Sequence, residues 1–271
     1  MKDLKIFPSN EFITPDEVRS PLGDKLFFKS RWYFYIEILR SVSRLKPFAL
    51  DGSYDRVMWA NSSFEMFKLA EACGCRFNMT GLDNIRANPD EPMVIVSNHM
   101  STLETVVFPA IFASMREVTF VIKDSIMKNP IFKHIMGTRN PVVVSRVNPR
   151  EDLKTVLKEG TERLKNGTSV IIFPQSTRAE EFNPSEFNSL AVKLARKAQV
   201  PLMPVAIKTD FWGNGKLSLF KEFGPLHRDR AAYMDFGEPF PLKGNGNEEH
   251  QMVIDFIENR LEKWRSLSSV S

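Results

Sequence analysis

One histidine and one glutamate, His99 and Glu104, have the residue types and the spacing needed to move a proton. They follow the apolar run Met93–Ser97, which is typical of a buried strand. Five residues on an α-helix rotate by about 500°, so side chains at this spacing lie about 140° apart. His99 must therefore precede the helix if Glu104 is to reach back to it from the first turn. The carboxylate would then fix the imidazole tautomer and stabilise the imidazolium, as the orienting partner of a general base does.

The same residues also fit a purely structural role. The segment Ser101–Glu104 matches a capping box, in which Ser101 caps a helix and Glu104 accepts a hydrogen bond from the Ser101 backbone N–H. The local sequence alone favours this cap over a catalytic carboxylate. Both arrangements hold Glu104 beside the turn, so one structure can contain both.

The elements that must position these residues alternate between strands and helices. This alternation is typical of an α/β domain with a mainly parallel sheet flanked by helices, in which ligands bind at the carboxyl ends of the strands. The predicted strands are Met93–Ser97, Val118–Ile122, Val142–Ser145, Ser169–Phe173 and Leu202–Ile207, with Leu217–Phe220 and Ala232–Phe236 at the sheet's edge. The predicted helices are Asn61–Ala72, capped by Ser62 or Ser63, and Leu103–Met115, Ile126–Ile135, Glu151–Lys165, Glu186–Ala198 and Gln251–Trp264.

Residues 1–55 are predicted to form an extension of the α/β domain, which covers residues 56–271. The first thirty residues contain three prolines and no sustained periodicity, which indicates an irregular arm. The apolar residues that follow recur at helical spacing with basic flanks, and they predict an amphipathic helix on a membrane surface. Packing of this helix on the domain's own core is an equally good interpretation. Its predicted apolar face contains Trp32, Tyr35, Ile36, Leu39 and Val42.

Composition limits the classes of function. Lys and Arg number 37 against 33 acidic residues, without one long basic run, so nucleic acid is not indicated as a partner. No run approaches the roughly 20 apolar residues of a spanning helix, and the N-terminus does not match a signal peptide. The cysteines Cys73 and Cys75 are too close for a mutual disulfide and too few for a structural zinc site, which favours reduced thiols in the cytoplasm.

Four segments carry a resemblance to a known family. In chain order they are Asn98-His99 with Glu104, then Val142–Arg146, Phe173–Arg178 and Val200–Val205. Their order and spacing resemble the NH-x4-D, arginine-bearing strand end, FPEGTR and VPxxPV motifs of the PlsC-type lysophospholipid and glycerol-3-phosphate acyltransferase superfamily. The resemblance covers roughly residues 60 to 240.

The resemblance implies a glycerol-3-phosphate-acyltransferase-like fold and acyl transfer from acyl-CoA or acyl carrier protein to a hydroxyl of a lysophospholipid or related lipid. His99 would be the general base, oriented by Glu104, with no acyl-enzyme, metal or cofactor. The protein would work in the cytoplasm, peripherally attached to the inner face of the cell membrane. Two arginines would bind the anionic group of the acceptor, because a guanidinium pairs with phosphate oxygens through two N–H groups. The implied substrate-binding residues are Asn98, Arg146, Gln175, Ser176, Thr177 and Arg178.

Several residues depart from the family pattern. Glu104 replaces the usual aspartate, Gln175 and Ser176 replace the glutamate and glycine of FPEGTR, and Asn188 stands where many members have a lysine. These changes leave two alternatives open: a catalytically inactive member that binds a lipid or a partner, and an acyl thioester or ester hydrolase. The retained histidine and acid argue against the first. The lack of a G-x-S-x-G motif argues against a serine hydrolase.

Overall fold

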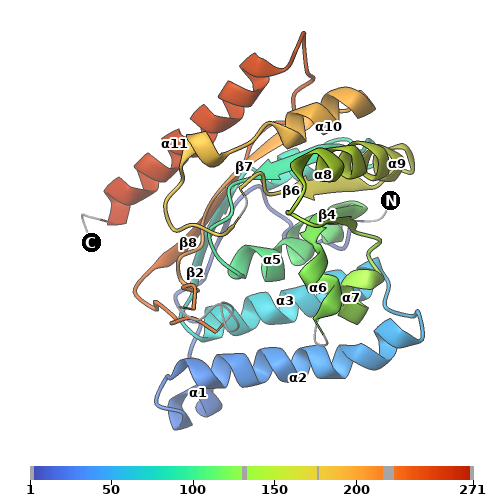
Figure 1. The fold of residues 1–271 in the computed structure, drawn as a ribbon. Coiled ribbons are helices and arrows are strands. Elements are labelled where there is room, and N and C mark those ends of the chain that lie inside the picture. The colour runs from blue at the N-terminus through green and yellow to red at the C-terminus, as the bar shows by residue number, and fades with distance from the viewer. Residues whose placement is uncertain (1–2, 130–132, 176, 216–222, 269–271) are drawn as a thin grey trace.

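The computed structural model describes residues 3–129, 133–175, 177–215 and 223–268. Within these residues one sheet of eight strands runs in the order β1-β2-β8-β7-β3-β6-β4-β5 (Figure 1). The five strands β3 to β7 are parallel, β8 is antiparallel to β7, and β2 is parallel to β8 and antiparallel to β1. The predicted α/β class with a mainly parallel sheet is confirmed. The strands are β1 Phe12–Ile13, β2 Arg76–Thr80, β3 Val94–Ser97, β4 Val118–Lys123, β5 Val142–Val144, β6 Ser169–Ile172, β7 Leu202–Lys208 and β8 Ala231–Phe236.

The five central strands lie where the apolar runs predict them. The position of β8 differs from the prediction, because β8 lies between β2 and β7 and not at the edge of the sheet. The sequence pattern predicts neither β1 nor β2. In β2 the residues alternate between buried and more exposed positions, starting at the exposed Arg76, so no apolar run marks the strand. The predicted strand Leu217–Phe220 lies outside the described residues.

Both faces of the central strands are buried, which is the reason for their near-continuous apolar sequences. In β3, Ile95 packs into the core on one face, and Val94 and Val96 pack into the core on the other. Helices α2, α3 and α5 lie on the first side, and α10 and α11 lie on the second (Figure 1). The helices are α1 Leu22–Leu26, α2 Arg31–Leu50, α3 Arg56–Ala72, α4 Leu82–Arg86, α5 Leu103–Phe108, α6 Asp124–Lys128, α7 Lys133–Gly137, α8 Pro149–Thr155, α9 Thr161–Lys165, α10 Leu190–Ala198 and α11 Asn247–Ser268.

Several helices differ in extent from their predictions. The predicted helices Leu103–Met115 and Glu151–Lys165 are interrupted by π-helical stretches, and Ile126–Ile135 is divided between α6 and α7. Helix α10 begins at Leu190, whose backbone N–H donates to Asn188 Oδ1 at 3.0 Å. Helix α3 begins earlier than predicted, because Asp55 caps it by accepting from the Met58 N–H, while Ser62 and Ser63 are buried within the helix.

The N-terminal segment joins the domain through both the sheet and the core. The predicted irregular arm supplies β1, which pairs with β2. Helix α2 buries a face that shares only Tyr35 and Val42 with the predicted one, and Trp32 is 53% exposed. Ile36 and Leu39 are half-buried. The buried face consists of Phe34, Tyr35, Ile38, Val42 and Leu45.

Arg116 is a fully buried cation that holds the segment leading into β3. Its Nη2 donates to Ile85 O at 2.8 Å and to Ala87 O at 3.0 Å, and its Nη1 donates to Glu91 O at 3.2 Å. Burial lowers the pKa of Arg116 to about 10, which leaves the side chain charged at neutral pH. Arg116 therefore holds the segment that precedes β3, whereas His99 follows the strand at its other end.

We expect Arg116→Met to lower the free energy of unfolding by roughly 3 kcal/mol, because the backbone carbonyl groups before β3, including that of the buried Ile85, lose their hydrogen-bond donor. Urea denaturation followed by circular dichroism measures the change. Arg150→Met is the control, since Arg150 is exposed, and its effect should stay below about 0.5 kcal/mol. Equal losses in the two variants would contradict this role of Arg116.

Candidate active site

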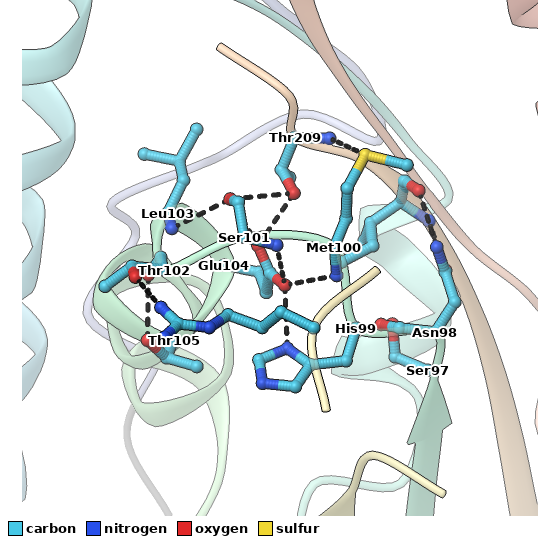
Figure 2. Close-up of polar contacts among 12 residues, drawn as sticks. Ser97, Asn98, His99, Met100, Ser101, Thr102, Leu103, Glu104, Thr105 and Thr209 are labelled. Atoms are coloured by element: carbon cyan, nitrogen blue, oxygen red, sulfur yellow. Dashed lines mark hydrogen bonds and ion pairs between the residues drawn. The ribbon is translucent and has the colours of Figure 1, made fainter. Parts of the chain in front are cut away.

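His99 and Glu104 lie in contact at the carboxyl end of β3. The His99 Nδ1 and Glu104 Oε1 atoms are 2.8 Å apart (Figure 2). Strand β3 is bonded to β6 on one side and to β7 on the other, so the turn that follows starts from a fixed position. Helix α5 begins at Leu103, which puts His99 before the helix and Glu104 in its first turn. This is the arrangement that the five-residue spacing requires for contact.

The Glu104 carboxylate is completely buried and receives hydrogen bonds on both oxygens. Oε1 accepts from His99 Nδ1 and from the backbone N–H groups of Met100 and Ser101, each at 2.8 Å. Oε2 accepts from Ser101 Oγ at 2.8 Å and from Thr209 Oγ1 at 2.7 Å. Burial by itself raises the pKa of Glu104, but the bonds from His99, Thr209 and Ser101 outweigh burial and hold the pKa below its ordinary value. The buried carboxylate is therefore ionised at neutral pH.

The helix cap and the contact with histidine exist together. The Ser101 N–H bond to Glu104 is half of the predicted capping box, and the Leu103 N–H donates to Ser101 Oγ at 3.0 Å. One carboxylate oxygen thus satisfies two backbone donors of the turn and the imidazole at once. The two interpretations of Glu104 are compatible in geometry.

The imidazole of His99 has one nitrogen engaged and one available. Because an ionised carboxylate can only accept, Nδ1 carries a proton, and in the neutral imidazole Nε2 then carries the lone pair. Figure 2 shows Nε2 pointing away from Glu104, and within the described residues Nε2 has no hydrogen-bond partner. The ring stacks on Phe173 with centroids 4.3 Å apart and is 12% exposed. An imidazole held in this way can take a proton from a group that approaches Nε2.

Asn98 and Gln175 hold the turn from two neighbouring strands. The Asn98 side chain bonds in both directions to the backbone of Ile207 on β7, at 2.8 and 2.9 Å. Gln175, after β6, accepts the His99 backbone N–H on Oε1 at 2.7 Å and is buried. An amide oxygen is sufficient for that bond, so the glutamine makes it without the negative charge of the family's glutamate.

The predicted arginines lie at different distances from His99. Arg178 is half-buried and donates to Thr102 Oγ1 next to the turn, while Thr177 is exposed and Ser176 lies outside the described residues. Arg146 follows β5, which is three strands from β3 in the sheet. At about 4.8 Å per strand, that separation is roughly 14 Å. Arg178 therefore belongs to the immediate surroundings of His99, and Arg146 lies farther along the same edge.

Thr209 is the residue of this site that the sequence motifs do not mark. It follows β7 directly, is fully buried, and bonds to Glu104. A hydroxyl residue at the carboxyl end of a parallel strand was its only signal in the sequence. Asn188, in place of the family's lysine, donates from Nδ2 to the backbone oxygen of Pro174 and so supports the loop before Gln175.

The comparisons with known proteins agree with this geometry. A family model described as Acyltransferase matches residues 76–208, the segment that contains β3, the His99–Glu104 turn and the loop after β6. This match supports the PlsC-type acyltransferase superfamily for residues 76–208. Within the described residues, no helix is long and apolar enough to span a membrane.

Two curated relatives and one crystal structure illustrate the similarity. The chain is 32% identical over 143 residues to a 1-acyl-sn-glycerol-3-phosphate acyltransferase of Pseudomonas aeruginosa. The aligned residues make up 53% of each of the two chains. It is 31% identical over 160 residues to a chloroplastic enzyme of the same name from Arabidopsis thaliana, covering 59% of this chain and 40% of that one. The chain thus spans about half the length of the curated relatives it matches. The crystal structure of the PlsC acyltransferase from Thermotoga maritima superimposes with a TM-score of 0.69 at 20% identity, covering 89% of this chain and 95% of that one.

Proposed function

We propose that this protein transfers a fatty acyl group from an acyl thioester to the free hydroxyl of a 1-acyl-glycerol-3-phosphate. The observation that carries the proposal is the His99–Glu104 pair at the end of β3, with Nε2 of the imidazole available to a substrate hydroxyl. The names of the relatives support this acceptor. Acyl-CoA or acyl carrier protein would supply the thioester.

The proposed reaction needs one base and an activated acyl group. His99 Nε2 removes the proton from the acceptor hydroxyl, whose oxygen forms a bond to the thioester carbonyl carbon. The carbon–sulfur bond then breaks, and the departing sulfur takes the proton from the imidazolium, so an ester and a thiol are formed. Glu104 stabilises the imidazolium between the two proton transfers. The thioester is already reactive, so the reaction requires neither an acyl-enzyme nor a metal.

The acceptor's phosphate would be bound by arginine. Arg178 adjoins the turn that carries His99, and a guanidinium can pair with two phosphate oxygens at once. Arg146, farther along the same edge, would contribute to the charge that attracts an anionic headgroup.

Two of the departures from the family pattern, Gln175 and Asn188, make hydrogen bonds that support the loop beside His99, which favours an active enzyme over an inactive binding protein. A hydrolase, in which water replaces the acceptor hydroxyl, uses the same base and is distinguished by its product.

The test is acyl transfer from labelled acyl-CoA and acyl carrier protein donors to a panel of lysolipids, with products separated by chromatography. We expect labelled diacylglycerol phosphate from 1-acyl-glycerol-3-phosphate. Thioester cleavage without a labelled lipid would support the hydrolase. A folded protein without turnover on any donor would support the binding protein.

We further propose that the protein attaches peripherally to an anionic membrane surface, on the cytoplasmic face of the cell membrane. Exposed apolar side chains gather on α1 and at the turn into α2, where Phe28 is 94% exposed. Phe28 adopts a left-handed backbone conformation with φ of 53°, which is rare for a bulky residue and is found at functional turns. Basic residues lie between the apolar ones, as in segments that bind at the lipid headgroups. The apolar residues are Leu22, Leu26, Phe27, Phe28 and Trp32, and the basic ones are Lys25, Lys29 and Arg31.

We expect the double variant Leu26→Ser, Phe28→Ser to bind vesicles of phosphatidylglycerol and phosphatidylcholine about tenfold or more weakly than the wild type. Both side chains are exposed, so their loss removes apolar area available to lipid without disturbing the core. Vesicle sedimentation measures the binding. Met252→Ser on α11, across the sheet from α2, is the control. Undiminished binding by the double variant would exclude this surface.

A further inference from the structure

Among the described residues, Thr209 is the one donor to Glu104 that comes from outside the β3–α5 turn. The other four donor groups belong to His99, Met100 and Ser101, which adjoin Glu104 in the chain. Thr209 Oγ1 approaches Oε2 at 2.7 Å from the end of β7, and both side chains are completely buried. Figure 2 shows the two hydroxyls of Ser101 and Thr209 meeting above the carboxylate, with their oxygens 3.1 Å apart.

This origin gives Thr209 a different mechanical effect from the other donors. Groups of the turn move together with Glu104, so their bonds do not fix the carboxylate relative to the sheet. The bond from Thr209 does fix the carboxylate relative to the sheet, because Thr209 directly follows β7, the strand hydrogen-bonded to β3. A carboxylate held at both oxygens by two separate elements cannot rotate away from the imidazole without breaking a buried hydrogen bond.

The segment that carries Thr209 is itself attached to the turn and to α2. Asn214 Nδ2 donates to the Met100 backbone oxygen at 3.0 Å. Trp212 is buried and packs edge-to-face against Phe34 of α2, with ring centroids 4.9 Å apart. The position of Thr209 is therefore determined by packing on both sides.

We propose that Thr209 is a positioning residue that acts through Glu104 to keep the His99 imidazole oriented for proton transfer. It follows immediately after residues 76–208, the segment matched by the family model. The inference rests on the proposed acyl transfer for its kinetic consequences. Its structural consequence, the geometry of the hydrogen bond between His99 and Glu104, is measurable without turnover.

Thr209→Val keeps the shape of the side chain and removes only the hydroxyl. We expect kcat to fall about tenfold with KM within about twofold, since Thr209 is completely buried and acts through Glu104. A hydrogen bond to an ionised carboxylate lowers its pKa, so its loss raises the pKa of Glu104. The Glu104 carboxylate is then protonated at a higher pH as the solution is acidified, so the acid limb of the kcat/KM profile moves to higher pH. Thr209→Ser, which keeps the hydroxyl, should restore both values.

The deciding measurement is the proton magnetic resonance of the His99 Nδ1–H group, assigned by its absence in His99→Ala. We expect a shifted resonance in Thr209→Val and a wild-type position in Thr209→Ser. Thr119→Val is the matched control, because Thr119 is equally buried and donates to Arg139 O at 2.7 Å. This bond does not involve His99 or Glu104. If the valine variant does not fold, Thr209→Ala is measured in the same way.

An unchanged resonance together with an unmoved acid limb in the valine variant would overturn the proposal. A wild-type protein without acyl transfer would instead refute the proposed function. In that case the Nδ1–H resonance alone still decides whether Thr209 orients the pair.

Discussion

His99→Ala is expected to lower kcat about 10³-fold or more, while the protein remains folded. The variant removes the only group that, in the proposed reaction, takes the proton from the acceptor hydroxyl, and general bases contribute about 10²- to 10⁴-fold. Glu104 keeps its bonds from Met100, Ser101 and Thr209, so the buried carboxylate is not left without donors. Steady-state acyl transfer to 1-acyl-glycerol-3-phosphate measures the effect.

The matched control for this variant is His134→Ala on α7, a half-buried histidine outside the site. It should retain wild-type kcat. If His99→Ala and His134→Ala were equally active, the general base would have to be another residue. Thermal unfolding of all three proteins separates a loss of chemistry from a loss of structure.

Glu104→Gln is expected to reduce kcat on the order of 10²-fold, because the neutral amide can hold the imidazole but cannot stabilise an imidazolium by charge. The site should accommodate the substitution. The amide oxygen can replace Oε1, and the amide N–H₂ group can donate to the hydroxyls of Ser101 and Thr209, which rotate to accept. Activity close to that of the wild type would reduce Glu104 to a helix cap.

A second buried glutamate provides the control for Glu104→Gln. Glu71 on α3 is buried and accepts from Thr14 Oγ1 at 2.7 Å, so Glu71→Gln changes a similar environment away from His99. It should alter stability without altering kcat. The comparison separates the effect of the charge at Glu104 from that of placing an amide in the core.

The depressed pKa of Glu104 also predicts how stability depends on pH. A carboxylate whose pKa is lower in the folded state stabilises the protein above its unfolded pKa, and this contribution is lost as the pH falls through the folded pKa. Acidification below the ordinary range of a glutamate should therefore destabilise the wild type more steeply than Glu104→Gln. Urea denaturation at several acidic pH values measures both slopes.

The sequence by itself determined the order of the elements and the local geometry of the turn. The apolar runs of β3, β4, β5, β6 and β7 identify strands buried on both faces, and the alternation with helices identifies the sheet as mainly parallel. The spacing of His99 and Glu104 requires the histidine to precede the helix, because only there can a side chain of the first turn reach it. These features depend on neighbouring residues, whose types and intervals are visible in the chain.

Only the tertiary structure decided which distant groups complete the site. Thr209 reaches Glu104, and Gln175 reaches the His99 backbone, because β7 and β6 flank β3 in the sheet. The strand order is a long-range property, so no local pattern specifies which side chains meet at the sheet's edge. The same reason explains the inner position of β8 and the face that α2 buries. Packing against partners far away in sequence selects among arrangements that the local pattern allows equally.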